Sequence, residues 1–248
     1  IVVPESLRTE LVRQAHSNTF GGGHVGPDRV LARLKNFWWW KMDTAVREFI
    51  RRCDICQRTK SGQPLNHGRV GTLAAAAGPN QVVAVDHIGA FKPGPSGNKY
   101  VLVCVDQFTK WMTAIPVKDT TAGTTERALV EGLFCKMGIP VKIVSDNGPA
   151  FSAELSTQLV RRIGVQHQFS TPLHPQGNSI IERGNKSIKQ ILTAYAEENS
   201  RHWEENLQLA VYAYNTAVHS STGVTPFFAT YGRDPQLPFE IAVLNPPP

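Results

Sequence analysis

The most restrictive feature of the sequence is a set of two histidines and two cysteines within its first 60 residues. Seven residues separate His16 from His24, and two separate Cys53 from Cys56, which gives the pattern H-x7-H-x28-C-x2-C. Two imidazoles and two thiolates complete a tetrahedral zinc shell and leave no position for a water molecule. The pattern therefore predicts a structural Zn²⁺ site. A segment this short needs such a site, because it cannot bury a large hydrophobic core.

A second interpretation is a redox-active C-x-x-C pair with two unrelated surface histidines. A redox pair is expected after a strand in a β-α-β unit, whereas this pair follows a helical pattern.

Residues 1–60 predict three short helices. The residues that indicate them are Leu7, Leu11 and Ala15 on the first, Pro27 at the start of the second and Asp43 as the cap of the third. Trp38–Trp40 could stack on bases, but we expect a core role in so small a domain.

The remainder of the chain has a different pattern. Residues 61–80 are rich in Gly, Pro and Ala and predict a linker. Beyond it we expect strands at 82–88, 99–106, 112–117, 141–145 and 165–169, and helices at 121–137, 152–163, 179–197 and 201–216. Three strands followed by strands that alternate with helices indicate an α/β fold. It has a mixed five-stranded sheet with flanking helices on both faces.

Three acidic residues occupy unusual places in this pattern. Asp86 lies inside a strand, Asp146 follows a strand at a turn, and Glu182 opens a long helix. If the three carboxylates converge at one edge of the sheet, they repel each other and need divalent cations to stay ionised. Each has an ordinary alternative as a turn or helix-start residue, and Asp86 is the hardest to explain that way. Asp106 also ends a strand, and we expect it to serve a turn.

Charge is concentrated in the first quarter of the chain. Residues 1–60 hold 11 of the 26 Lys and Arg but 6 of the 20 Asp and Glu. A basic segment is typical of a surface that binds phosphates, although a solubilising bias explains it equally well. No apolar run approaches the roughly 18 residues of a membrane span, so we expect no membrane partner.

With these motifs in place, the chain resembles the integrases of retroviruses and LTR retrotransposons, and among them the gypsy-type (metavirus) branch. His16, His24, Cys53 and Cys56 match the HHCC zinc domain of that family. Asp86, Asp146 and Glu182 match its D,D-35-E triad, with 35 residues between the last two. Further matches lie in the segments 105–111, 145–148, 174–176 and 214–226.

The resemblance implies an RNase H-like core over residues 81–235 behind the zinc domain. The expected activity is that of a DDE-type polynucleotidyl transferase with endonuclease activity. It would process the 3′ ends of retroelement DNA and transfer them into target DNA with two Mg²⁺ or Mn²⁺ ions on the three acids. Residues expected to contact DNA or shape the site are Lys186, Lys189, Arg183 and Asn147, with Gln176 and Asn178 on a loop before the helix.

The resemblance also implies a homo-multimer, a host targeting factor and a nuclear location reached from cytoplasmic particles. Residues 236–248 would begin a linker to a C-terminal DNA-binding domain that this sequence does not contain. Two other functions fit parts of the pattern. One is a host-captured DNA-binding protein without catalysis, and the other is a general RNase H-class nuclease.

Overall fold

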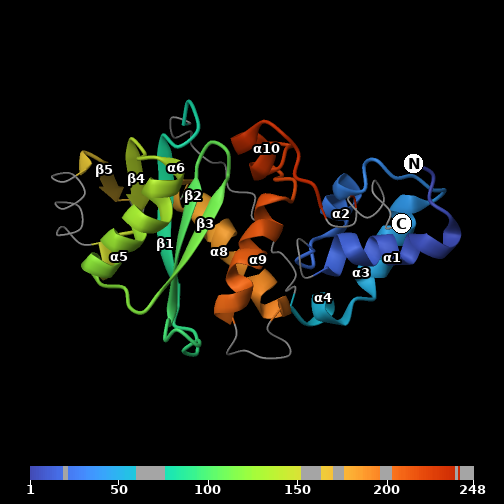
Figure 1. The fold of residues 1–248 in the computed structure, drawn as a ribbon, viewed down its shortest axis with the longest axis horizontal. Coiled ribbons are helices and arrows are strands. Elements are labelled where there is room, and N and C mark those ends of the chain that lie inside the picture. The colour runs from blue at the N-terminus through green and yellow to red at the C-terminus, as the bar shows by residue number, and fades with distance from the viewer. Residues whose placement is uncertain are drawn as a thin grey trace, which may run out of the picture.

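Two units lie side by side along the long axis of the molecule (Figure 1). The computed structural model describes residues 1–18, 22–59, 76–151, 163–169, 176–195, 203–237 and 240. The predicted linker and the predicted helix at 152–163 therefore lie mostly outside the described residues. No helix in the described ranges is long and apolar enough to cross a membrane.

The first unit is built from short helices. They are α1 (Glu5–Ser17), α2 (Pro27–Arg33), α3 (Met42–Arg51) and α4 (Asp54–Thr59). The predicted third helix exists, but Lys41 in a left-handed conformation precedes it and Asp43 lies inside its first turn, so Asp43 is not the cap. The fourth helix was not predicted, because its six residues carry too little periodicity to indicate one.

The core of this unit is small and completely buried at its centre. Val30, Leu34 and Val46 have no exposed surface. The buried residues of α1 all lie in its C-terminal half. Of the three residues that indicated this helix, Leu11 and Ala15 are therefore buried, whereas Leu7 is 57% exposed. Trp39 belongs to the core, as expected, whereas the side chains of Trp38 and Trp40 are exposed.

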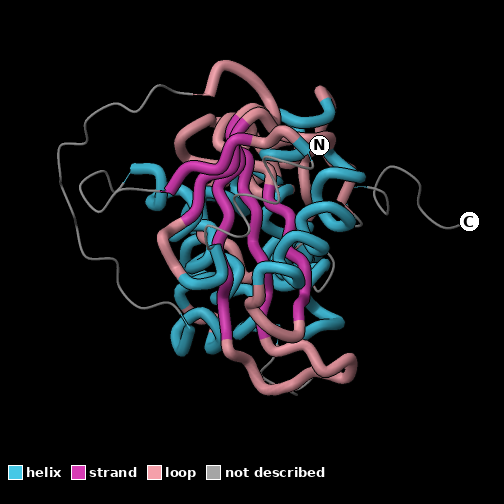
Figure 2. Tube along the Cα trace, turned by 90° about the vertical axis from the view of Figure 1, so that its left-hand side faces the viewer, coloured by secondary structure: helices cyan, strands magenta, loops and turns pink. Residues whose placement is uncertain are grey.

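The second unit contains the predicted mixed sheet. Its strands are β1 (Val82–Gly89), β2 (Tyr100–Asp106), β3 (Met112–Val117), β4 (Lys142–Ser145) and β5 (Gln166–Phe169), in the order β3-β2-β1-β4-β5. The β1–β2 and β2–β3 pairs are antiparallel, and the β1–β4 and β4–β5 pairs are parallel. Figure 2 shows these strands with helices on both sides of the sheet.

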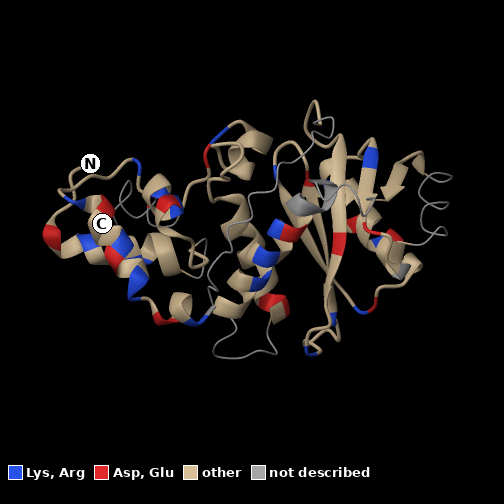
Figure 3. Ribbon diagram, turned by 180° about the vertical axis from the view of Figure 1, so that it is seen from behind, with Lys and Arg blue, Asp and Glu red and all other residues tan. Residues whose placement is uncertain are grey.

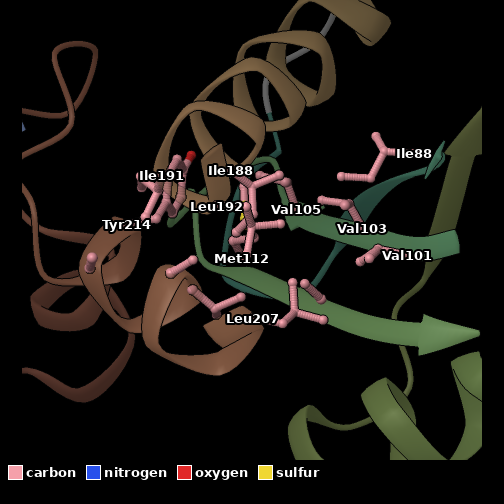
Figure 4. Close-up of a cluster of buried hydrophobic side chains, with 14 of the residues drawn as sticks. Ile88, Val101, Val103, Val105, Met112, Ile188, Ile191, Leu192, Leu207 and Tyr214 are labelled. Carbon is pink, nitrogen blue, oxygen red and sulfur yellow. The ribbon is translucent and has the colours of Figure 1, made fainter. Parts of the chain in front are cut away.

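The two faces of the sheet carry separate cores. Val83 and Val85 of β1 pack toward the segment formed by α5 (Ala122–Ala128), the π-helical η1 (Leu129–Phe134) and α6 (Cys135–Met137). Ala84 and Ile88 pack toward α8 (Gln176–Tyr195) and α9 (Trp203–Asn215) on the opposite face (Figure 4). Because side chains alternate along a strand, Asp86 shares the face that α8 covers.

The two units are joined by direct contacts. The buried guanidinium of Arg33 donates hydrogen bonds to the carbonyl oxygens of Ala15 at 2.8 Å, Gly22 at 2.9 Å and Ala213 at 3.2 Å. Ala213 lies on α9, so one side chain ties the zinc-site segment to the core unit. A Cβ on Gly23 would lie 2.7 Å from the Cβ of Ala213, which shows how closely the backbones approach.

Candidate zinc centre and carboxylate site

The predicted zinc ligands meet at one point in the first unit. The ligand atoms of His16, His24, Cys53 and Cys56 all lie within 4.8 Å of one another. His16 ends α1, Cys53 follows α3, and Cys56 lies on α4. Gly22 and Gly23 form the turn that returns the chain to His24, and Gly23 has a φ of 61° that favours glycine.

The distances between these atoms fit a tetrahedral zinc ion. The Sγ of Cys56 is 3.4 Å from Nε2 of His16 and 3.8 Å from Nδ1 of His24, and the Sγ of Cys53 is 3.4 Å from the same Nδ1. Ordinary Zn–S and Zn–N bond lengths separate a sulfur and a nitrogen by about 3.6 Å on a tetrahedron. His16 directs Nε2 to the site because its Nδ1 lies 3.0 Å from the carbonyl oxygen of Val25.

Among the described acids of the second unit, Asp86 has a strongly raised pKa. Its carboxylate accepts hydrogen bonds from the backbone N–H of His87 at 2.8 Å and from Nδ2 of Asn185 at 2.6 Å. Burial first, and then the negative charge of Asp146, raise the pKa of Asp86 to about 6. The two hydrogen bonds and the positive charge of Lys189 act in the opposite direction. Asp86 and Asp146 are therefore close enough to repel each other.

The sheet register explains why these two acids meet. Ala84 of β1 pairs with Val144 of β4 in a parallel ladder. If this register is continued by two residues, Asp146 comes beside Asp86. Asp146 is exposed, and its Oδ1 accepts a hydrogen bond from the backbone N–H of Gly148 at 3.0 Å. Asn147 is exposed on the same turn, so both predicted turn residues remain accessible.

Glu182 lies on α8, but its place on the helix differs from the prediction. The helix begins at Gln176, so Glu182 lies nearly two turns inside it, where its side chain is exposed. Asn185 follows one turn later and binds Asp86, so α8, the helix that carries Glu182, passes beside that carboxylate. In the described ranges, only the HHCC residues form a group of three or more potential ligands close enough to share an ion.

The expected DNA-contact residues divide into two groups. Arg183, Lys186 and Lys189 are exposed on α8, where Figure 3 shows Lys and Arg bands along the helix. Gln176 and Asn178 were predicted on a loop, and this was wrong because both lie in the first turn of α8. Their side chains lie outside the described part of the structure.

One further acid, Asp106, and one amide, Asn185, lie close to these residues in the fold or on the same helix. Asp106 serves the turn expected of it, since its carboxylate accepts hydrogen bonds from the backbone N–H groups of Phe108 and Thr109 and from the Thr109 hydroxyl. Asn185 was missed by sequence reasoning. It is buried, and its Oδ1 has no hydrogen-bond partner among the described residues. An asparagine three residues after Glu182 on the same helix was the available signal.

Each of the two units matches a known protein family. Residues 3–62 match the family described as "Integrase zinc binding domain", and residues 76–175 match "Integrase core domain". The Gag-Pol polyprotein of Koala retrovirus is 32% identical over 230 residues, which cover 91% of this chain and 13% of the polyprotein. Gypsy retrotransposon integrase-like protein 1 of Macaca fascicularis is 26% identical over 243 residues, which cover 96% of this chain and 45% of that protein.

Solved structures show the same fold. An intasome of simian T-cell lymphotropic virus in complex with PP2A regulatory subunit B56 gamma has a TM-score of 0.61 at 19% identity, covering 93% of this chain and 74% of that chain. The HTLV-2 integrase catalytic core domain in complex with magnesium has a TM-score of 0.52 at 21% identity, covering 62% of this chain and 99% of that chain.

These matches define a zinc-binding unit followed by an RNase H-like integrase core. The chain belongs to the integrase family of retroviruses and LTR retrotransposons, and its relatives include gypsy-type proteins. It spans less than half the length of the curated relatives named above.

Proposed function

We propose that this chain catalyses 3′-end processing and strand transfer of retroelement DNA into target DNA, as a DDE-type polynucleotidyl transferase. The observation that carries the proposal is the closeness of Asp86 to Asp146, whose negative charge adds to burial in raising the pKa of Asp86. A buried acid next to a second acid is unfavourable without a cation, and such perturbed groups concentrate at functional sites. The family match to an integrase core supports the same reaction class.

The three acids are the residues that would hold the catalytic Mg²⁺ or Mn²⁺ ions. Carboxylate oxygens are the ligands that these hard cations prefer. When bound, the ions would polarise the phosphodiester and lower the pKa of the attacking hydroxyl. The donor set fits this role, because the negative charges of Asp86 and Asp146 repel each other and the carboxylate of Glu182 is exposed on the helix whose Asn185 binds Asp86.

The remaining residues would prepare the site and hold DNA. Asn185 orients the carboxylate of Asp86, and the backbone N–H of His87 favours its ionised form. Lys186 and Lys189 lie one and two turns after Glu182 on α8, where they would bind phosphates of the element end. Arg183 and Asn147 border the same site.

The assembly proposed for this function is a homo-multimer on two retroelement DNA ends, engaged with target DNA. A host factor would direct it to its sites, and the work would take place in the nucleus after delivery from cytoplasmic particles. One structural neighbour is an intasome in complex with a PP2A regulatory subunit, which supports a multimer and a host partner.

A second candidate is a host-captured DNA-binding protein that has lost catalysis. The similarity of this chain to an integrase-like protein of a primate keeps this candidate open. The retention of all three acids, with Asp86 in a costly position, favours the active enzyme.

A strand-transfer assay with a short donor duplex in Mg²⁺ or Mn²⁺ tests the proposal. Joined products support the integrase, binding without reaction supports the captured protein, and cleavage without joining supports a general nuclease. Asp86→Asn should abolish joining while zinc content stays unchanged. Asp119→Asn is the matched control, because Asp119 is an exposed acid whose carboxylate accepts hydrogen bonds from the backbone N–H and the hydroxyl of Thr121. Full joining by Asp86→Asn would refute the assignment.

A further inference from the structure

The turn that carries Asp146 is held by a serine and a histidine to which the proposed reaction gives no part. Ser145 ends β4 and is completely buried, and His167 lies on the neighbouring strand β5. The hydroxyl of Ser145 donates a hydrogen bond to the backbone carbonyl of Asp146 at 2.7 Å. Nε2 of His167 lies 2.8 Å from the oxygen of the same hydroxyl. Two consecutive hydrogen bonds therefore connect the ring of His167 to the backbone of Asp146.

The direction of each bond follows from the single proton of a hydroxyl group. Since Ser145 gives that proton to the carbonyl of Asp146, its oxygen can only accept from the histidine ring. His167 must then carry a proton on Nε2. Burial lowers the pKa of His167, so the ring is neutral at pH 7 and donates from Nε2–H.

Both side chains lie on the face of the sheet that α8 does not cover. Side chains alternate along a strand, so Ser145 shares a face of β4 with Ile143. Ile143 belongs to the core on the α5 side of the sheet, and His167 is its partner in the parallel register. Asp86 lies on the opposite face. Ser145 and His167 therefore support the carboxylate site from the other side of the sheet.

The ring of Phe151 packs against the same histidine. Phe151 follows the turn of Asp146, and its side chain is buried. Its ring lies edge-on to that of His167, with 6.4 Å between the centroids. It also stacks on His87 at 5.0 Å, and His87 is the residue after Asp86. One aromatic ring thus connects the turn of Asp146, the strand of Asp86 and the histidine.

Asp146 depends on this support because its own side chain is weakly held. Its carboxylate is exposed and accepts a hydrogen bond from Gly148, which belongs to the same turn. That bond moves with the turn and cannot fix the carboxylate relative to Asp86. The backbone of the turn must do so. A displacement of about 1 Å in a catalytic group can cost roughly 100-fold in rate.

We propose that His167 and Ser145 are positioning residues for Asp146. Their two hydrogen bonds fix the backbone carbonyl of Asp146, and through it the place of its carboxylate beside that of Asp86. The inference rests on the proposed function, because it assumes that the two acids bind divalent cations together.

Metal affinity tests the proposal without relying on turnover. Mn²⁺ alone is the probe, and its binding to the zinc-loaded full chain is measured from the electron paramagnetic resonance signal of free Mn²⁺. Binding that Asp146→Asn removes is assigned to the carboxylate site. His167→Leu and Ser145→Ala should each weaken this binding by about 10-fold. The Mg²⁺ concentration for half-maximal joining should rise by a similar factor, while joining at saturating Mg²⁺ stays close to that of the parent.

His167→Gln separates the hydrogen bond from the packing of the ring. Gln and Leu are similar in size and both lack the ring, but Gln can donate an N–H from near the place of Nε2. His167→Gln should therefore approach the Mn²⁺ affinity of the parent. If Ser145→Ala melts early, this pair of variants decides the test.

Ser221→Ala is the matched control. Ser221 also places its hydroxyl against a histidine ring, 3.0 Å from Nδ1 of His219, but it is exposed on the loop after α9. Its Mn²⁺ affinity and its Mg²⁺ requirement should equal those of the parent.

Equal Mn²⁺ affinities of His167→Leu and His167→Gln would overturn the proposal, whether both match the parent or both are weakened. A lowered melting temperature with the Mn²⁺ affinity of the parent would likewise overturn it. Catalysis is scored separately. If the parent does not join DNA but shows the expected series of Mn²⁺ affinities, the proposed reaction is refuted and the positioning role is retained. Normal joining with equal affinities would do the reverse, and a parent without binding that depends on Asp146 would refute both.

Discussion

The zinc centre and the carboxylate site differ in how far each is assembled by the protein itself. The four zinc ligands lie within 4.8 Å of one another, in a unit whose core surrounds them. Asp86 lies on the central strand, Asp146 follows the strand beside it, and Glu182 lies nearly two turns inside α8. The three acids do not form a closed group in the described part of the chain. Both sites are formed by segments distant in sequence, so distance along the chain does not explain the difference.

Electrostatics explains this difference between the zinc centre and the carboxylate site. Neutral imidazoles and protonated thiols can pack together without an ion, and hydrogen bonds such as that of His16 to Val25 orient them. Three carboxylates cannot do so, because each ionised group raises the cost of ionising the next. Burial, and then the charge of Asp146, already raise the pKa of Asp86 when only two of the acids are close. A catalytic site of this kind remains open until its ions and substrate arrive.

The largest effect should come from removing a zinc ligand. Cys56→Ser should release zinc and unfold the first unit, because structural zinc sites contribute roughly 10 kcal/mol or more of folding free energy. Atomic absorption and a circular dichroism melting curve measure the two effects. Cys135→Ser is the control, since Cys135 is exposed and outside the site. A Cys56→Ser protein that keeps its zinc and melting temperature would contradict the comparison.

Asn185→Ala tests whether the carboxylate site depends on its supporting hydrogen bond. Loss of the Asn185 bond to Asp86 should lower the joining rate by about 10- to 100-fold and raise the Mg²⁺ concentration needed for half-maximal activity. Thr193→Ala, an exposed substitution on the same helix, should leave both unchanged. An unchanged Mg²⁺ requirement in Asn185→Ala would show that the bond has no positioning role.

The metal-free protein provides a test of the repulsion between acids. The pKa of Asp86 is raised in the folded state, so the stability it contributes at low pH is lost as pH rises through about 6. Asp86→Asn removes this loss. Its melting temperature relative to the parent should therefore increase from about pH 5 to about pH 8 in the presence of a chelator.

Asp119→Asn should behave differently in the same experiment. Hydrogen bonds from Thr121 hold the pKa of Asp119 below its usual value, so its stabilising effect is complete above that range and is lost only in acid. The melting difference for this variant should stay constant over the interval in which the Asp86→Asn difference grows. Parallel curves for the two variants would remove the electrostatic explanation.

The smallest effect concerns Lys189. Its charge lowers the pKa of Asp86, so Lys189→Ala should move the acidic limb of the pH profile for joining to higher pH. Lys186→Ala is the comparison, because the charge of Lys186 is not among the influences on Asp86. Equal shifts in both variants would indicate a general loss of positive charge rather than a specific effect on that carboxylate.

Most of the fold was predictable because its signals are local. Strand patterns, turn residues and the H-x7-H and C-x2-C spacings are properties of neighbouring residues, and they placed the sheet and the zinc ligands correctly. The start of α8 was predicted three residues late, which moved Gln176 and Asn178 onto a loop. Helix boundaries depend on capping and packing that short windows do not contain.

The sequence by itself determined the identities of the zinc ligands, the candidate acids and the succession of strands and helices along the chain. Only the tertiary structure decided that Asn185 would hold Asp86 and that Arg33 would join the two units. Each of these depends on how closely separate elements approach. That approach is set by the packing of side chains from many segments, which no local pattern encodes.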